Sequence, residues 1–280
     1  MRFSLVLPTI RRTDELQRFL VSLHNQTHRD FELIVVDQNP DARLVPILVP
    51  YKAEFPVLHL RSDKKGQSRA RNLGFHYGTG DIVAFPDDDC QYPPDLLESV
   101  DRFFVSNLGV DGLTGRSIDE DGMTSNGRFA TRAGTINKYN VWSHGISYTI
   151  FLRRSSVQEV RFNEELGPGA GTRWGASDET EYLLQLLEHK LALYYEPRVC
   201  VIHPEPRNPS TYKHLKHRAY TYSCGMGYVL KSHGYPLWYV LYYCARPVGG
   251  MLLALGRGKT AKASYHWAVF RGRLAGWVGS

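Results

Sequence analysis

The sequence contains no acidic residue after Glu205, only four cysteines and no uninterrupted apolar run of membrane-spanning length. The cysteines form no Cys-x-x-Cys pair and have no zinc-ligand spacing, which argues against a disulfide framework and a structural zinc site. They are Cys90, Cys200, Cys224 and Cys244. The first residues enter a strand-like segment without an apolar leader, so we expect a protein that is not secreted. A reducing, cytosolic compartment fits both observations.

The 280 residues include 42% hydrophobic and 22% charged side chains, which indicates a globular protein with one large or two small domains. The net charge of +6 is unevenly distributed. Residues 211–280 carry ten Lys/Arg, no acid and thirteen aromatic residues, whereas residues 1–210 have a net charge of −4. A basic segment rich in aromatic residues indicates binding to nucleic acid or to an anionic membrane surface.

Strands and helices are predicted to alternate along the first hundred residues. The predicted strands cover 3–7, 31–36, 57–60 and 81–85, and the predicted helices begin near residues 13, 66 and 93. This order predicts an α/β fold with a doubly wound, mostly parallel sheet that binds ligands at the carboxyl ends of its strands. Thr9, Asp37 and the run Asp87–Asp89 all follow predicted strands at that edge.

The second half has weaker periodicity. Residues 115–140 are rich in Gly, Asp and Asn, and we expect loops there. The patterns then predict a strand at 146–152, a short helix from 155, a mobile glycine-rich segment at 167–175, a helix from 177, and strands at 191–195 and 199–202. In the basic segment, Arg246-Pro247 and Gly249-Gly250 interrupt 236–256, which predicts two short amphipathic pieces rather than one span.

Three consecutive aspartates, Asp87–Asp89, repel one another unless a cation compensates them. Mg²⁺ or Mn²⁺ is a natural partner for these oxygens and leaves positions for phosphate oxygens. His203, at the end of a late strand, is a candidate further ligand. A solvated acidic turn and a structural histidine are the simpler interpretations, and the sequence pattern leaves both open.

Two helix starts also carry candidate functional residues. Asp178 and Glu179 occupy the first turn of a helix, where acids favour the helix dipole, but the glycine-rich segment before them is typical of a lid beside a general base. Arg69 and Arg71 lie in the first turns of the helix opened by Gly66, where cations are unfavourable unless they pair with a bound pyrophosphate or a nearby acid.

Six short motifs, taken in order, resemble family 2 glycosyltransferases with the GT-A fold over about residues 1–205. They are Pro8-Thr9, Asp37, Gly66-Gln67-Ser68-Arg69-Ala70-Arg71-Asn72, Phe85-Pro86-Asp87-Asp88-Asp89, Ser177-Asp178-Glu179-Thr180-Glu181 and Ile202-His203. The resemblance implies a GT-A domain at 1–210, with a nucleotide-sugar half at about 1–114 and an acceptor half at about 115–210. A basic amphipathic helical tail at 211–280 would follow it.

The resemblance also implies roles for individual residues. Asp37 would hold the nucleotide base, Arg71 the donor, and Asp87 and Asp89 the ribose and the metal-diphosphate, with His203 as a further metal ligand. The implied nucleotide-sugar site comprises Pro8, Thr9, Asp37, Gly66, Arg71, Asp87 and Asp88, and the implied metal site comprises Asp89 and His203.

Two positions depart from the family pattern. Gln38 stands where a second Asp is usual, and the family's Glu-Asp pair is inverted to Asp178-Glu179. Glu179 matches the usual base by position and Asp178 by residue type, so either one is a candidate catalytic base.

These features predict an inverting, non-processive hexosyltransferase that depends on Mn²⁺ or Mg²⁺. It would move one sugar from a nucleotide-diphosphate sugar to a hydroxyl of a glycan or lipid-linked acceptor, in surface polysaccharide or glycolipid synthesis. The Gln-x-x-Arg-Trp motif of processive synthases is absent. We expect a cytoplasmic protein that is peripherally associated with the cytoplasmic face of the membrane and binds anionic lipid through 211–280. We expect no nucleic acid partner. A metal-dependent phosphohydrolase and a non-enzymatic protein that binds nucleic acid or another anionic surface are the alternatives.

Overall fold

The computed structural model describes residues 1–204 and 212–279. The chain divides into two compact units. The first, here called the sheet unit, comprises 1–65, 69–162 and 182–205; the second, the helical unit, comprises 66–68, 163–181 and 206–280. The predicted boundary at residue 210 remains a proposal.

The sheet unit contains one eight-stranded sheet in the order β3-β2-β1-β4-β7-β5-β8-β6. Its strands are β1 (Phe3–Thr9), β2 (Phe31–Asp37), β3 (Val57–Arg61), β4 (Ile82–Ala84), β5 (Gly112–Ile118), β6 (Gly134–Thr135), β7 (Ile150–Arg153) and β8 (Leu193–Ile202). The first four strands are mutually parallel, as is the pair β5–β8, while β7 and β6 pair antiparallel with their neighbours. The structure therefore has the predicted α/β class with a mixed, mostly parallel sheet.

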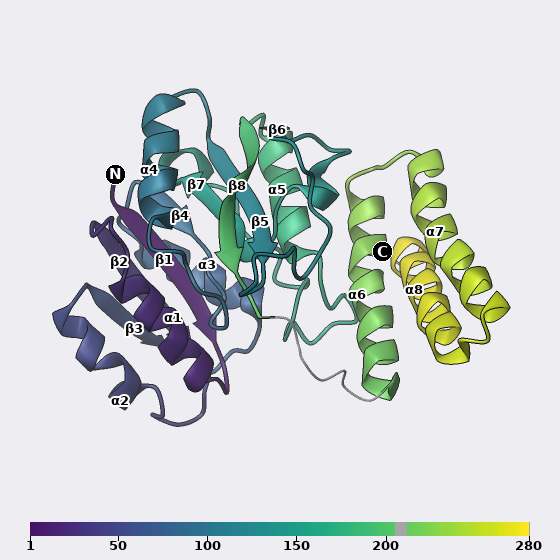
Figure 1. The fold of residues 1–280 in the computed structure, drawn as a ribbon, viewed down its shortest axis with the longest axis horizontal. Coiled ribbons are helices and arrows are strands. Elements are labelled where there is room, and N and C mark those ends of the chain that lie inside the picture. Colours follow the sequence, from purple (N-terminus) through teal and green to yellow (C-terminus); the bar gives the residue numbers. More distant parts are fainter. Residues whose placement is uncertain (205–211, 280) are drawn as a thin grey trace. The chain divides into compact units, whose positions relative to one another are not determined.

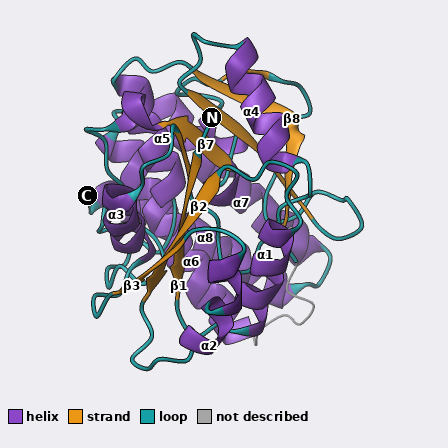
Figure 2. Cartoon of the chain, turned by 90° about the vertical axis from the view of Figure 1, so that its left-hand side faces the viewer, coloured by secondary structure: helices purple, strands orange, loops and turns teal. Residues whose placement is uncertain are grey.

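Helices cover both faces of this sheet (Figures 1 and 2). On one face, α1 (Asp14–His24), α2 (Val45–Leu48) and α4 (Leu96–Ser106) bury leucines and phenylalanines against the odd-numbered residues of β1 and β2. On the other face lies α3 (Gln67–Tyr77), where a Cβ at Gly74 would press on the side chains of Val6 and Val36. These contacts account for the apolar spacing that predicted α1 and α4.

Several expectations for the second half of the sheet unit are wrong. Residues 115–118 belong to β5 and residues 134–135 to β6, so the segment 115–140 is only partly loop. The predicted strand at 146–152 begins only at Ile150, after a 3₁₀ helix (Ser147–Thr149). The short helix predicted from residue 155 is present, as a 3₁₀ helix (Arg154–Val157).

The two strands predicted at 191–195 and 199–202 are one strand, β8. Its pairing with β5 shifts register between Thr114 and Arg116, where a Cβ at Gly115 would collide with Val199. The irregularity accommodates Pro197, which cannot donate a ladder hydrogen bond, within the strand.

The helical unit contains α6 (Tyr212–Ser232), α7 (Leu237–Gly256) and α8 (Thr260–Val278), together with the first part of α5 (Asp178–Glu188). Gly272 and Gly276 lie four residues apart on α8, and a Cβ at either would collide with a carbonyl oxygen of α6, so glycine allows the two backbones to approach closely. The prediction of two short pieces at 236–256 is wrong, because α7 continues through Pro247. None of the helices in the described part of the chain is long and apolar enough to cross a membrane.

Candidate active site

The carboxyl ends of β1, β2 and β4 meet at one edge of the sheet. Thr9 and Asp37 are paired in the β1–β2 register, and the run Asp87–Asp89 follows β4, which pairs with β1 on its other side. Thr9 Oγ1 donates a 2.7 Å hydrogen bond to Asp88 Oδ2. The sheet topology thus places Thr9 and the acidic run together, as the sequence predicted.

Each of the three aspartates has a cationic or imidazole partner from elsewhere in the sheet unit. Arg71, which is 0% exposed, donates from Nη2 to Asp87 Oδ1 at 3.0 Å. Arg12 Nη1 donates to Asp88 Oδ1 at 2.7 Å and also forms an ion pair with Asp89. His203 Nε2 lies 3.0 Å from Asp89 Oδ1. Side chains of the protein therefore compensate much of the negative charge of the run.

Burial and pairing affect the three titrating groups differently. Burial raises the pKa of Asp88 to about 6, although Arg12 and the Thr9 hydrogen bond oppose this shift. Burial also raises the pKa of Asp89, but the His203 hydrogen bond and the charges of His203 and Arg12 outweigh it and lower the pKa overall. For His203, burial lowers the pKa, and the hydrogen bond and charge of Asp89 more than offset this and raise it.

The predicted metal ligands are adjacent. Residue Ile202, at the end of β8, pairs with Gln91, and this bridge brings the following His203 to Asp89. One carboxylate oxygen and one imidazole nitrogen fit Mn²⁺, which accepts both kinds of donor. The described residues contain no cluster of three or more His, Cys, Asp or Glu side chains suited to a metal. A metal held by this pair would therefore need further oxygen ligands, such as diphosphate or water.

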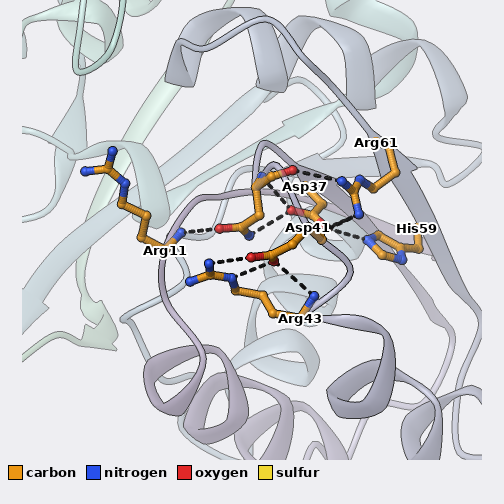
Figure 3. A network of polar contacts seen from close by, with 7 residues as sticks. Arg11, Asp37, Asp41, Arg43, His59 and Arg61 are labelled. Carbon is orange, nitrogen blue, oxygen red and sulfur yellow. Dashed lines mark hydrogen bonds and ion pairs between the residues drawn. The ribbon is translucent and has the colours of Figure 1, made fainter.

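Asp37 is 0% exposed and lies inside a polar network of the sheet unit (Figure 3). Asn39 donates to Asp37 Oδ1 from its backbone nitrogen and from Nδ2, both at 2.8 Å. His59 Nε2 lies 3.0 Å from Asp37 Oδ2, and the more exposed Arg61 reaches within 3.8 Å of the same oxygen. Arg61 also donates to the carbonyl oxygen of Asn39 at 2.9 Å. These contacts fix the loop after β2 and leave no surface of Asp37 open to solvent.

Two other predicted donor-site residues occupy different environments. Pro8 lies within β1 opposite Val36 of β2. Gly66 belongs to the helical unit and has φ of +128°, a conformation that favours glycine, immediately before α3. Gln67 and Ser68, which follow it, bond to the carbonyl oxygens of Pro168 and Leu166 at 3.1 and 2.9 Å. The start of α3 is thereby tied to the glycine-rich segment.

The predicted acid pair lies at the end of that segment, in the helical unit. Asp178 is buried and packs against Gly167, where a Cβ would stand 2.7 Å from the Asp178 carboxyl carbon. Glu179 is partly exposed. Ser177, just before them, has φ of +74°, which is rare for a residue with a side chain and marks local backbone strain.

The sequence interpretation missed Arg12, His59 and Arg61. A signal for Arg12 was present, because Arg11-Arg12 follows β1 at the edge where the acids gather. His59 and Arg61 are two residues apart on β3, so their side chains lie on the same face of the sheet. Asp37 lies on that face too, because it is directly opposite Arg61 in the pairing of β2 with β3.

Comparison with known proteins identifies the family. The family description Glycosyl transferase family 2 matches residues 4–161. One curated relative is poly(ribitol-phosphate) beta-N-acetylglucosaminyltransferase TarP of Staphylococcus aureus, 26% identical over 167 residues, covering 57% of this chain and 50% of TarP. Another is GalNAc(5)-diNAcBac-PP-undecaprenol beta-1,3-glucosyltransferase of Campylobacter jejuni, 24% identical over 182 residues, covering 62% of this chain and 58% of that protein. Across the first curated relatives, the match spans 18–59% of their length.

Solved structures share the fold. S. aureus TarS 1–349 in complex with UDP-GlcNAc aligns with a TM-score of 0.63 at 14% identity, covering 100% of this chain and 93% of that one. Mannosyltransferase PcManGT from Pyrobaculum calidifontis, in complex with GDP-Man and Mn²⁺, aligns with a TM-score of 0.64 at 16% identity, covering 98% and 87%. The predicted GT-A fold is confirmed. With the family match over more than half of its residues, the chain belongs to glycosyl transferase family 2.

Proposed function

We propose that the protein is an inverting, metal-dependent glycosyltransferase that moves one sugar from a nucleotide-diphosphate sugar to a hydroxyl of a glycan or lipid-linked acceptor. The observation that carries this proposal is the set of carboxylates Asp87–Asp89 with Arg12, Arg71 and His203, at the carboxyl edge of a GT-A sheet. A phosphate-rich donor needs cations and metal-binding carboxylates side by side, and this edge offers both.

Different residues of the sheet unit would bind or support different parts of the donor. Asp89 and His203 would hold the metal, which when bound supplies Lewis-acid stabilisation of the leaving diphosphate. Arg71 is held by Asp87 beneath the ring of Phe162, 5.2 Å from its centroid, so its guanidinium is fixed in place. Asp88 accepts hydrogen bonds from Thr9 and Arg12 and would thereby fix the conformation of the loop after β4, where the nucleotide would bind. In this proposal Asp37 does not touch the nucleoside. It would fix the position of the residues that it hydrogen-bonds, and these residues would form the nucleoside end of the site.

One of the two acids at the start of α5 would remove the proton of the acceptor hydroxyl. Attack on the face of the anomeric carbon opposite the diphosphate then inverts its configuration. The partial exposure of Glu179 supports it as the base, because a base must reach the acceptor, whereas Asp178 is packed against Gly167. Asp178 in that case acts as a positioning residue for the glycine-rich segment.

We further propose a role in surface polysaccharide or glycolipid synthesis at the cytoplasmic face of a membrane. Support comes from the relatives, whose names refer to a poly(ribitol-phosphate) and to an undecaprenol-linked glycan. The basic, acid-free residues 211–280 agree with an anionic lipid surface as partner.

A donor screen tests the proposed activity. We expect one class of nucleotide sugar, from a panel that includes UDP-GlcNAc and GDP-Man, to raise the unfolding midpoint of the protein in the presence of Mn²⁺. Differential scanning fluorimetry with and without EDTA measures this shift. If no nucleotide sugar or nucleoside diphosphate shifts the midpoint, the sheet edge is not a donor site.

Replacing the proposed metal ligands should separate metal-dependent binding from folding. Asp89→Ala and His203→Ala should weaken Mn²⁺-dependent binding of the donor diphosphate by about tenfold or more and nearly abolish transfer, because the diphosphate loses its counter-charge. Calorimetric titration of the nucleoside diphosphate with Mn²⁺ measures the binding. Asp30→Ala is the matched control, because Asp30 is exposed and precedes β2 at the opposite edge. Unchanged transfer in EDTA, or in Asp89→Ala, would contradict metal dependence.

Replacing the acids of α5 identifies the base. Glu179→Gln should lower the turnover number by roughly a hundredfold while donor affinity stays unchanged, which is the size expected for loss of general-base assistance. Asp178→Asn should change turnover less, and Glu188→Gln, an exposed position at the other end of the same helix, should change neither quantity. The reverse order of effects would assign the base to Asp178. Normal turnover in both variants would leave these acids with a role in helix capping only.

A further inference from the structure

Helix α7 is apolar on its outer as well as its inner face. Its inner side chains, which include Tyr239, Val240 and Cys244, are buried. Its outer side chains are 50–66% exposed: Leu237, Trp238, Leu241, Tyr242, Leu252, Leu253 and Leu255. We refer to these seven as the outer α7 face. A helix with both faces apolar is ordinarily buried on both, so this face lacks the environment that its composition requires.

The seven residues follow one side of the helix. Leu237-Trp238 and Leu241-Tyr242 form two pairs four residues apart near the start of the helix, and the other three leucines lie near its end. The small residues Ala245 and Gly249 lie on the same side between the two groups. Arg246 is the single cation within this stretch, and its guanidinium lies 5.7 Å from the ring centroid of Tyr242. The large apolar side chains therefore form two groups on one side of α7, one near each end of the helix.

The charges around this face have one sign. The described residues of α6, α7 and α8 and the turn between α7 and α8 contain no acid. Exposed cations lie close in sequence to Leu252, Leu253 and Leu255, in the turn and at the start of α8: Arg257, Lys259 and Lys262. The surface thus combines exposed leucines, a Trp and a Tyr with cations, which is the composition of a helix lying at a membrane interface.

This composition argues against two other occupants. A second copy of the chain would bring a surface of the same positive sign against this one, and like charges oppose such an interface. Single-stranded nucleic acid would use aromatic stacking, whereas five of the seven side chains are leucines, whose burial a polar nucleic acid does not provide.

We propose that the outer α7 face inserts into the headgroup region of an anionic lipid bilayer, with Arg257, Lys259 and Lys262 contacting anionic headgroups. This deepens the membrane association proposed for 211–280 by naming the surface that touches lipid. Insertion of this face into a bilayer requires no donor, acceptor or metal. If the protein does not insert, the proposed transfer reaction is therefore unaffected.

Vesicle co-sedimentation of the full chain tests the proposal. The intact protein should bind vesicles of phosphatidylglycerol and phosphatidylcholine, and added salt should weaken this binding. Leu241→Ser and Leu252→Ser should each lower the partition coefficient by about tenfold, because each removes a leucine from the inserted face. Replacing Arg257, Lys259 and Lys262 together with Gln should lower binding to anionic vesicles by about a hundredfold.

Leu108→Ser is the matched control, because Leu108 is 80% exposed in the sheet unit and should not contribute. Circular dichroism melting verifies that each variant is folded, which is expected for exposed positions. The proposal is overturned if the intact protein does not bind vesicles, if neutral vesicles bind it equally, or if Leu108→Ser has the same effect as Leu241→Ser. It is also overturned if the leucine variants abolish self-association in light scattering, or RNA binding, without changing lipid binding.

Discussion

Electrostatic compensation of three consecutive carboxylates is the constraint on which the sheet edge depends. Asp88 and its neighbours follow the short central strand β4, where burial makes uncompensated charge costly. Arg12 comes from the segment after β1, Arg71 from α3 and His203 from the end of β8. The acidic run therefore holds together parts of the chain that are distant in sequence. In the proposed function, groups of this cluster would bind a phosphate-bearing ligand and its metal.

Much of the sheet unit could be predicted because its signals are local. Strands such as Phe31–Asp37 are apolar apart from Glu32 and end at a polar residue, and α1 and α4 bury one periodic face. The predictions were wrong where strand pairing or helix packing, and not the local sequence pattern, determined the structure. Gly115 lets β8 continue past Pro197, and α7 continues through Pro247 while its inner face is buried. Neither outcome is encoded in the residues next to the proline.

The sequence predicted which candidate residues lie at this edge of the sheet. It did not predict their bonding partners or how deeply each side chain is buried. The positions of Thr9, Asp88 and Asp89 follow from the rule that parallel strands gather ligand-binding groups at their carboxyl ends. The partners Arg12 and His59 depend on which strands are neighbours, which the sequence alone did not reveal. Burial was also unpredictable, because it depends on packing across the sheet.

The central claim is that this sheet edge supports transfer of a sugar with inversion. The most direct measurement is the anomeric configuration of the product, read by nuclear magnetic resonance after reaction of an α-linked nucleotide sugar, Mn²⁺ and a glycan or lipid-linked acceptor. A β-linked product that forms only with acceptor present is the predicted result. An α-linked product, or free sugar released at the same rate without acceptor, would contradict it.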